Sequence, residues 1–199
     1  MTQPSSLHRR HLLRHCARAA AWALPGCAGL AVARTAQASV AGAPRPAERA
    51  LAFNHLHTLE RLSPLVYARA SSYLTPALQT LNHFLRDHYT GEVGVMDPHL
   101  FDLLHQVQGT LGGRAARASA FEVISGYRCP ATNSHLKQTR GGGVAQRSLH
   151  MDGRAIDVRL PGVPLAELRD AALALKAGGV GYYPRDGFVH LDTGRVRAW

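Results

Sequence analysis

Two histidines and an aspartate in the second half of the chain have the residue types of a metal site. In the stretch SLHMDGRAID (148–157), His150 precedes Asp157 by seven residues, and His190 follows in a later predicted strand. Imidazole nitrogen and carboxylate oxygen both bind zinc, and a catalytic zinc site uses three protein ligands so that a fourth position is left for water. We therefore take these residues as candidate ligands of one zinc ion per chain.

The spacing of His150 and Asp157 requires a bend in the chain. Seven residues along a continuous strand would place their side chains on opposite faces, but Gly153 between them permits a turn that brings both together. In GRAIDVRL (153–160), Asp157 alternates with apolar residues, and in GFVHLDTG (187–194) His190 shares a face with Asp192. Because the chain contains twelve histidines, a chance set of three also fits the spacing.

The predicted elements that position these residues alternate between helices and short strands. Two strands are expected within 49–67, followed by helices over 74–89 and 97–113, with Asp97 as N-cap. A strand over 121–124, a short helix within 131–138, the strand 153–160, a helix over 164–175 and two final strands follow. This order predicts an α+β domain, a small antiparallel sheet with flanking helices.

Other histidines and the cysteines offer further candidates. His55 and His57 share a strand face and would form either a ligand pair or, as the pattern favours, a solvent-facing pair. Cys16 and Cys27 lie in the first 38 residues, so a chain without that segment keeps Cys129 alone and forms no internal disulfide. We expect Cys129 to be a structural thiol rather than a nucleophile.

Composition and charge describe a single globular domain. The 199 residues are 46% hydrophobic and 18% charged, without the long apolar run of a membrane span. Loss of the five arginines in residues 1–38 lowers the formal charge from +10 to +5. The remaining basic residues are scattered and form no basic-aromatic module, which argues against nucleic-acid binding, and a mildly basic surface suits an anionic polymer.

The amino-terminal residues have the features of an export signal. Arg9 and Arg10 precede a weakly hydrophobic Ala-rich run, and AQA (36–38) resembles a cleavage site. We predict a twin-arginine signal over 1–38, a linker over 39–48 and a domain over 49–199, located in the periplasm. The alternatives are a basic helix that stays attached and a lipid anchor at Cys27, because LPGC (24–27) is similar to a lipobox.

Several motifs together resemble a known family. SxHxxGxAxD, filled by residues 148–157, with the later His190, resembles the metal motif of the D-alanyl-D-alanine carboxypeptidase and hedgehog-type zinc peptidases. ISGYRCPATN (124–133), GGVGYYPRDGFVHLDTGRVRAW (178–199) and LNHFLRDH (81–88) are similar to YcbK/MepK-like murein endopeptidases. The similarity covers roughly residues 49–199, and it implies a hedgehog/DD-peptidase-like fold.

The resemblance implies a zinc-dependent enzyme that cleaves peptide stems of peptidoglycan, with His150, Asp157 and His190 as ligands. Zinc lowers the pKa of bound water to about 7 and polarises the scissile carbonyl. Arg128 matches a conspicuous arginine of the family and would bind a substrate carboxylate or share oxyanion charge; the alternative is a structural arginine that fixes its loop.

The position of the general base departs from the wider superfamily. Relatives carry Glu or His two or three residues before the last histidine ligand, whereas this chain has Phe188 and Gly187 there. Asp192 follows His190 on the same predicted face and would either accept the proton of water or hold the His190 imidazole. Asp186 is a further candidate, although a turn aspartate commonly only forms the turn.

Three functions remain open at the level of sequence. The first is a periplasmic murein endopeptidase, active as a monomer on cross-links such as those between diaminopimelate residues, a preference suggested by the resemblance. The second is a non-catalytic wall-binding module that keeps the metal for stability. The third is a D-Ala-D-Ala carboxypeptidase, distinguished by release of free D-alanine.

Overall fold

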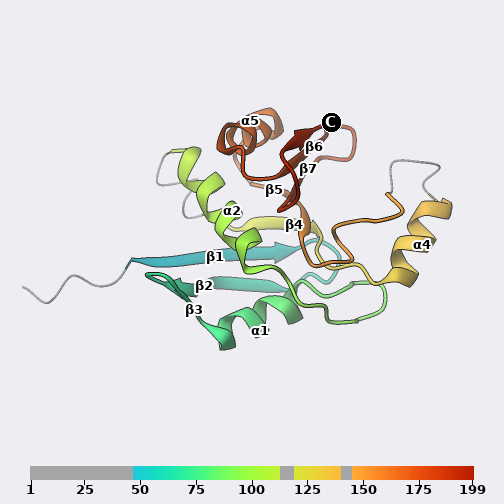
Figure 1. The fold of residues 1–199 in the computed structure, drawn as a ribbon, viewed down its shortest axis with the longest axis horizontal. Helices are drawn as coiled ribbons and strands as arrows, with labels where there is room; N and C mark the ends of the chain where they lie inside the picture. The colour runs from blue at the N-terminus through green and yellow to red at the C-terminus, as the bar shows by residue number, and fades with distance from the viewer. Residues whose placement is uncertain (1–46, 113–118, 140–144) are drawn as a thin grey trace, which may run out of the picture. The chain divides into compact units, whose positions relative to one another are not determined.

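The computed structural model describes residues 47–112, 119–139 and 145–199 (Figure 1). The predicted signal over 1–38, most of the predicted linker and the centre of the glycine-rich stretch 139–146 lie outside these residues. The elements are β1 (Glu48–His55), β2 (Arg61–Arg69), β3 (Ser72–Tyr73), α1 (Thr75–Phe84), α2 (Pro98–Thr110), β4 (Phe121–Ser125), α4 (Pro130–Thr139), β5 (Ala155–Arg159), α5 (Leu165–Leu175), β6 (Gly179–Tyr183), β7 (Phe188–Asp192) and β8 (Arg197–Ala198).

All described strands join one sheet of eight, in the order β3-β2-β1-β4-β5-β7-β6-β8. Neighbouring strands are antiparallel except β1 with β4 and β6 with β8, which are parallel. The α+β class is confirmed, but the sheet is a mixed one of eight strands and not the small antiparallel sheet that was predicted. The connection from β1 to β4 contains α1 and α2, and such a crossover allows parallel pairing. The hedgehog/DD-peptidase-like detail stays a prediction.

The helices cover the sheet at different places. Helix α2 packs against β1 and beside α5, while α5 also packs against β6 and β7, and α1 packs against β2 (Figure 1). Helix α2 begins as predicted, because the Asp97 carboxylate accepts a hydrogen bond of 3.0 Å from the His99 backbone N–H and Pro98 occupies the first turn. Helix α1 is shorter than predicted and ends at Phe84.

Strict alternation on β5 and β7 separates an apolar face from a polar face. Ile156 and Val158 of β5, with Val189 and Leu191 of β7, are buried in the hydrophobic core. Since side chains alternate along a strand, Asp157 and His190 point to the other face. The core therefore fixes the direction in which the candidate ligands point.

His55 is a correction to the expected solvent-facing pair. Its side chain is buried, and Nδ1 accepts backbone N–H bonds from His57 (3.2 Å) and Thr58 (3.3 Å). His57 is exposed and stacks on His88, with ring centroids 4.2 Å apart. Burial, with the neighbouring His57 and Arg86, lowers the pKa of His55 to about 4, against an opposing effect of Glu60.

We predict that His55 makes folding stability depend on pH. Its folded-state pKa of about 4 lies below the ordinary value of 6.5, so the unfolded chain binds the proton more readily. Its contribution is complete above pH 6.5 and is lost as pH falls toward 4, by up to about 3 kcal/mol. Urea unfolding of wild type and His55→Asn between pH 4 and 8 measures the difference, because the asparagine oxygen still accepts hydrogen bonds but does not titrate. Equal slopes in the two proteins would contradict the prediction.

Candidate metal centre

The candidate site lies along one row of residues across the sheet. Asp157 of β5 is directly opposite His190 of β7 in the antiparallel register. The row continues to Ser125 of β4 on one side and to Gly181 of β6 on the other. Residues directly opposite each other have Cβ atoms about 5 Å apart, so the register alone brings the Asp157 and His190 side chains together.

His150 reaches the same place from a turn that precedes β5. Gly153 in this turn has a φ of 65°, and a Cβ atom there would lie 2.0 Å from the backbone oxygen of Val95. The Asp97 N–H also donates to the Gly153 oxygen over 2.9 Å, so the turn is seated against the start of α2. The predicted bend is present. Because His150 lies in the turn and not on the strand, the alternation of strand side chains does not separate it from Asp157.

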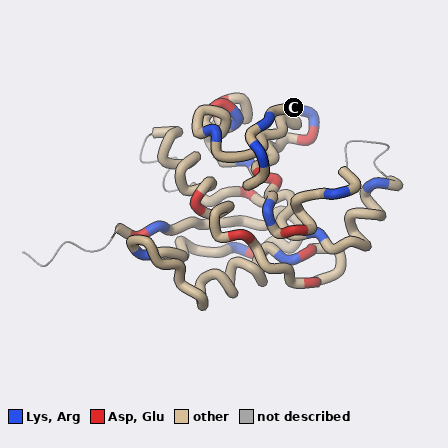
Figure 2. Tube along the Cα trace, in the orientation of Figure 1, with Lys and Arg blue, Asp and Glu red and all other residues tan. Residues whose placement is uncertain are grey.

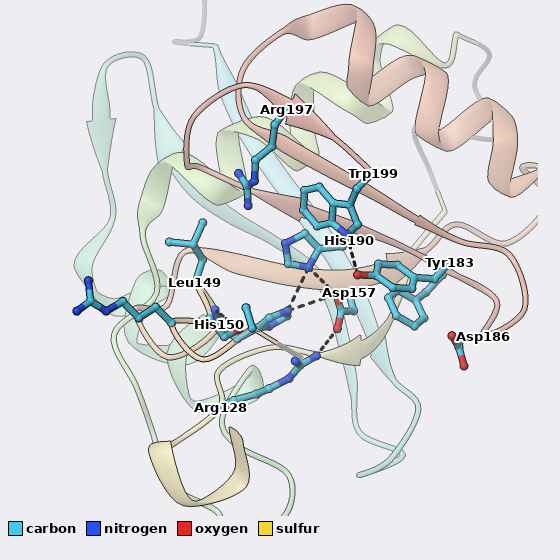
Figure 3. A pocket seen from close by; sticks show the side chains of 13 residues that line it. Arg128, Leu149, His150, Asp157, Tyr183, Asp186, His190, Arg197 and Trp199 are labelled. Carbon is cyan, nitrogen blue, oxygen red and sulfur yellow. Dashed lines mark hydrogen bonds and ion pairs between the residues drawn. The ribbon is translucent and has the colours of Figure 1, made fainter. Parts of the chain in front are cut away.

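The three ligand-type atoms converge closely. His190 Nδ1 is 2.8 Å from Asp157 Oδ1 and 3.2 Å from His150 Nε2, and His150 Nε2 is 3.3 Å from Asp157 Oδ1 (Figure 3). His150 and Asp157 are buried, and the His190 side chain is 12% exposed. Within the part of the chain that the structure describes, this is the group of His, Cys, Asp and Glu side chains able to hold a metal ion.

The outer hydrogen bonds of the imidazoles fix which nitrogens face inward as lone pairs. His150 Nδ1 lies 2.7 Å from the Gly126 carbonyl oxygen, which only accepts, so Nδ1 carries the hydrogen and donates it. His190 Nε2 lies 3.1 Å from the Asp192 carboxylate and donates in the same way. When both rings are neutral, His150 Nε2 and His190 Nδ1 therefore carry lone pairs that face the Asp157 carboxylate. These two nitrogens and the carboxylate oxygen are three acceptors directed toward one another.

Such a set of acceptors fits a cation at its centre. Ligand atoms of a tetrahedral zinc at about 2.0–2.2 Å are separated by about 3.3 Å, and the distances observed between the three atoms run from 2.8 to 3.3 Å. Two imidazole nitrogens and one carboxylate oxygen form the donor set of a catalytic zinc site, which leaves one position open.

The charges within the cluster depend on one another. Burial favours a neutral Asp157, but His150, His190 and Arg128 together hold the pKa of its carboxyl well below its usual range. Burial lowers the pKa of His150. For His190, burial acts in the same direction, but the hydrogen bonds to Asp157 and Asp192 outweigh it and raise the pKa. Asp157 is therefore an anion, and a positive charge beside Oδ1, the oxygen that faces the two histidines, is favoured.

Arg128 holds the outer side of Asp157. Its Nη2 donates to Asp157 Oδ2, and its Nε donates to Ser125 Oγ over 2.7 Å. Because Oδ2 is occupied in this way, Oδ1 is the oxygen left to face the histidines. Arg128 also lines the pocket, so its geometry accommodates both roles expected from the sequence.

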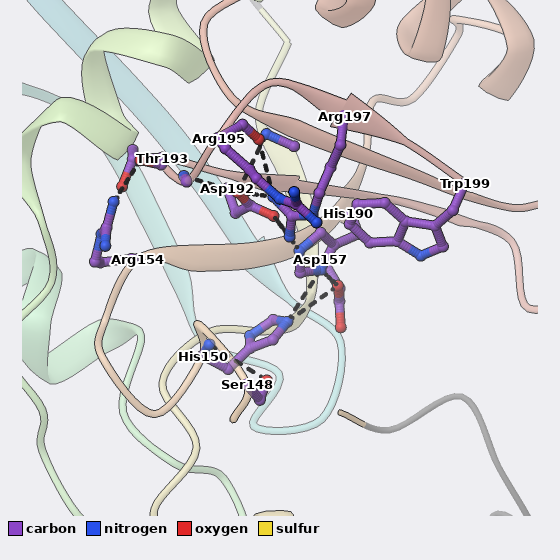
Figure 4. Close-up of polar contacts among 12 residues, drawn as sticks. Ser148, His150, Arg154, Asp157, His190, Asp192, Thr193, Arg195, Arg197 and Trp199 are labelled. Carbon is purple, nitrogen blue, oxygen red and sulfur yellow. Dashed lines mark hydrogen bonds and ion pairs between the residues drawn. The ribbon is translucent and has the colours of Figure 1, made fainter. Parts of the chain in front are cut away.

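Asp192 lies behind His190 and is fully buried. Its carboxylate accepts from the Gly179 and Gly194 backbone N–H groups (3.1 and 2.8 Å) and from both terminal nitrogens of Arg197 (3.0 and 2.7 Å), besides His190 (Figure 4). Although burial opposes it, these bonds hold the pKa of Asp192 well below its usual value. A carboxylate so fully engaged orients an imidazole and has little capacity left to accept another proton.

The cluster lines a pocket of about 720 Å³. Three arginines, Arg128, Arg147 and Arg197, also line it, with Asp157 and Asp186 as its described carboxylates. Elsewhere in the described chain basic and acidic residues are interspersed (Figure 2), and several form ion pairs, such as Arg86 with Glu60 at 2.6 Å. Arg147 forms no ion pair with any described residue. The pocket is thus suited to an anionic ligand.

Other side chains near the cluster take different places. Tyr183, Asp186 and Ser148 line the pocket, and Ser148 Oγ accepts a 3.4 Å hydrogen bond from the His150 N–H within the turn. His135 lies instead beside a separate, smaller pocket with Tyr89. Cys129 is buried, which agrees with a structural thiol.

Arg197 and Trp199 line the pocket but were not among the sequence-derived candidates. A usable signal lies in β6, where Gly179 and Gly181 alternate on the site face. A Cβ at Gly179 would lie 2.3 Å from Arg197 Nη1, and one at Gly181 would lie 2.7 Å from the Trp199 ring. Glycine inside a strand often marks close approach of another group.

Comparisons with known proteins identify the family of the chain. The family model Peptidase_M15_2, described as peptidoglycan L,D-endopeptidase MepK, matches residues 43–199. The peptidoglycan L,D-endopeptidase MepK of Escherichia coli K12 is 43% identical over 178 residues, which cover 89% of this chain and 93% of that protein. The probable peptidoglycan L,D-endopeptidase MepK of Haemophilus influenzae is 39% identical over 171 residues, 86% of this chain and 88% of that protein. No solved structure gives a significant match.

The described residues thus form an α+β domain in which His150, Asp157 and His190 make up a group that could hold a metal ion. The chain belongs to the peptidoglycan L,D-endopeptidase MepK family of peptidases, which confirms the resemblance seen in the motifs.

We predict that Gly153→Ala strongly destabilises the protein. A Cβ there would meet the Val95 oxygen at 2.0 Å in a backbone with positive φ, so the cost exceeds the roughly 1–2 kcal/mol of the left-handed conformation alone. Gly162→Ala is the matched control, because Gly162 has a φ of 80° but nothing within 4 Å of the added Cβ. Urea unfolding of both variants measures the difference, and equal losses would contradict the steric role of Gly153.

We predict that Asp192→Asn weakens zinc binding by about 10- to 100-fold, because the His190 imidazole loses its charged hydrogen-bond partner. Competition with a chromophoric chelator measures the affinity. Asp170→Asn is the control, since Asp170 is an exposed helical carboxylate whose side chain is 63% accessible. Unchanged zinc affinity in Asp192→Asn would show that Asp192 does not position His190.

Proposed function

We propose that the protein is a zinc-dependent endopeptidase that hydrolyses peptide cross-links of peptidoglycan in the periplasm. The observation that carries the proposal is the convergence of His150 Nε2, Asp157 Oδ1 and His190 Nδ1 on the wall of an open pocket. The match with relatives that are named peptidoglycan L,D-endopeptidases, which covers most of the length of each relative, supports the substrate class.

In this proposal His150, Asp157 and His190 hold one zinc ion per chain. When bound, zinc would lower the pKa of water to about 7 and polarise the scissile carbonyl. The chain's own contribution is preorganisation: Gly126 and Asp192 keep both imidazole lone pairs directed inward, and Arg128 keeps one Asp157 oxygen directed the same way.

Arg128 is proposed as a catalytic residue that also positions Asp157. A guanidinium has five N–H donors, and two hydrogen bonds to described side chains, Asp157 and Ser125, account for only part of them. The remaining N–H groups are available to a substrate carboxylate or to the oxygen that gains charge during hydrolysis. Arg147 at the same pocket adds a second site of attraction for the carboxylates of peptide stems.

Asp192 is proposed to act through His190 rather than as general base. Of the two roles considered from the sequence, the hydrogen bonds from Arg197, Gly179 and Gly194 favour the positioning role. The carboxylates that line the pocket, within the described residues, are Asp157 and Asp186. Because Asp157 is a proposed metal ligand, Asp186 is the carboxylate left as a candidate general base. A wall-binding module without catalysis is therefore the second candidate function.

The location and processing of the chain complete the proposal. A twin-arginine signal over 1–38, followed by a linker over 39–48 and the peptidase domain over 49–199, would deliver the protein to the periplasm as a monomer. Lipid attachment at Cys27 is the alternative to cleavage. In the ranges that the structure describes, no helix has the length and apolar character needed to cross a bilayer.

We predict that His150→Ala and His190→Ala each lower the cleavage of isolated sacculi by at least about 100-fold, because each removes a ligand. His83→Ala, on an exposed position of α1, is the matched control. Mass spectrometry of the released muropeptides identifies the bond that is cut and tests the preference for links between diaminopimelate residues.

Three outcomes of this experiment separate the candidate functions. Full activity in a preparation freed of metal by chelation would contradict the proposal. Retention of muropeptides without new products, with zinc bound, would support the binding module. Release of free D-alanine would indicate a carboxypeptidase.

A further inference from the structure

Two aromatic residues, Tyr183 and Trp199, lie near the row of residues across the sheet that contains Asp157 and His190. The backbone of Trp199 is tied to β6, because its N–H donates to the Val180 oxygen (3.3 Å) and its oxygen accepts from the Tyr182 N–H (3.0 Å). The indole lies with its ring centroid 5.2 Å from that of His190. Tyr183, on β6, lines the same pocket. The sheet therefore holds Trp199 beside a candidate ligand.

Gly181 makes room for this pair. It is directly opposite His190 in the register of β6 and β7. A Cβ at this position would lie 2.7 Å from the Trp199 ring and 2.8 Å from the Tyr183 ring. Any larger residue would push one of these rings away from the row, so their placement depends on the missing side chain.

The hydrogen bond between the two rings has only one possible direction. Trp199 Nε1 lies 2.7 Å from Tyr183 Oη, and an indole N–H only donates. The Tyr183 oxygen therefore accepts, and its own hydrogen is left for another acceptor. Among the described residues, the Tyr183 hydroxyl forms this one hydrogen bond, with Trp199. Figure 3 shows the hydroxyl on the side of the ring that faces Asp157 and His190.

Neighbouring groups hold both rings in place. The Tyr183 ring stacks on Phe188, with centroids 4.6 Å apart and planes inclined by 19°. The Arg197 guanidinium lies 4.7 Å from the Trp199 ring centroid and also binds the Asp192 carboxylate over 2.7 Å. A donor fixed in this way loses little freedom when a substrate oxygen arrives, which is the condition for effective stabilisation of developing charge.

From this geometry we infer that Tyr183 is a further catalytic residue, whose hydroxyl donates a hydrogen bond to the carbonyl oxygen of the scissile amide. Trp199 is a positioning residue that occupies the hydroxyl's acceptor side and so directs its hydrogen to the pocket. The inference rests on the proposed peptidase function and adds a donor to it.

The role of Tyr183 in hydrolysis involves no net proton loss. The oxygen of water forms a bond to the carbonyl carbon, and the π electron pair of the carbonyl moves onto its oxygen. The Tyr183 O–H bond stays intact while its hydrogen bond to this oxygen strengthens. The electron pair on this oxygen then re-forms the carbonyl double bond as the carbon–nitrogen bond breaks. The amine nitrogen takes both protons of the water, so the products are an ammonium group and a carboxylate.

The test is Tyr183→Phe, which removes the hydroxyl and keeps the ring. We expect kcat on a purified cross-linked muropeptide to fall roughly 100-fold with little change in KM, as for loss of one preorganised donor. Tyr182→Phe is the control, because Tyr182 is the preceding residue and packs instead under Arg169, whose guanidinium is 4.6 Å from the ring. Zinc content and thermal unfolding of both variants check that the site and the fold persist.

The positioning role of Trp199 has its own test. Trp199→Phe removes the indole N–H, and we expect a smaller loss of kcat that disappears when Tyr183 is already phenylalanine. An equal loss in both backgrounds would overturn the role of Trp199. Wild-type kcat in Tyr183→Phe, or a change confined to KM, would overturn the role of Tyr183. If wild-type protein cleaves the muropeptide in these assays, the proposed function stands whatever the result; if it does not, the proposed function itself fails.

Discussion

Three electron-pair donors meet on the polar face of the sheet, and much of the polar structure around them keeps them there. Burying the Asp157 carboxylate against two imidazole lone pairs is unfavourable unless positive charge lies between them. Gly126, Asp192 and Arg128 each bind the outward side of one member and so prevent it from turning away. The protein thereby directs three acceptor atoms toward one point, an arrangement that a small cation would stabilise.

The sheet allows this arrangement because its two faces have different roles. On one face the apolar residues of β5 and β7 join the core, in which α2 and α5 are packed. On the other face the same strands present Asp157 and His190 from directly opposed positions. The rigidity of a packed core is thus transmitted through the backbone to the polar side, where small displacements matter most for metal binding and catalysis.

Sequence reasoning succeeded where the relevant information is local. Period-two alternation identified the faces of β5 and β7, and Gly153 indicated the turn that carries His150 to the row. The parallel pairing of β1 with β4 and the burial of His55 depend on contacts between distant segments, which alternation does not contain. Arg197 and Trp199 were missed for the same reason: β8 has two residues, too few for a period, and only pairing with β6 reveals its place.

The register of β5 against β7 has a consequence for folding. Shifting β5 by one residue against β7 would turn Asp157 toward the core and present Ile156 to the pocket beside His190. A misaligned sheet would therefore present only one of the two strand-borne ligand candidates to the pocket. If the centre holds an ion as proposed, that ion would bind only when β5 and β7 are correctly paired, and it would selectively stabilise this alignment.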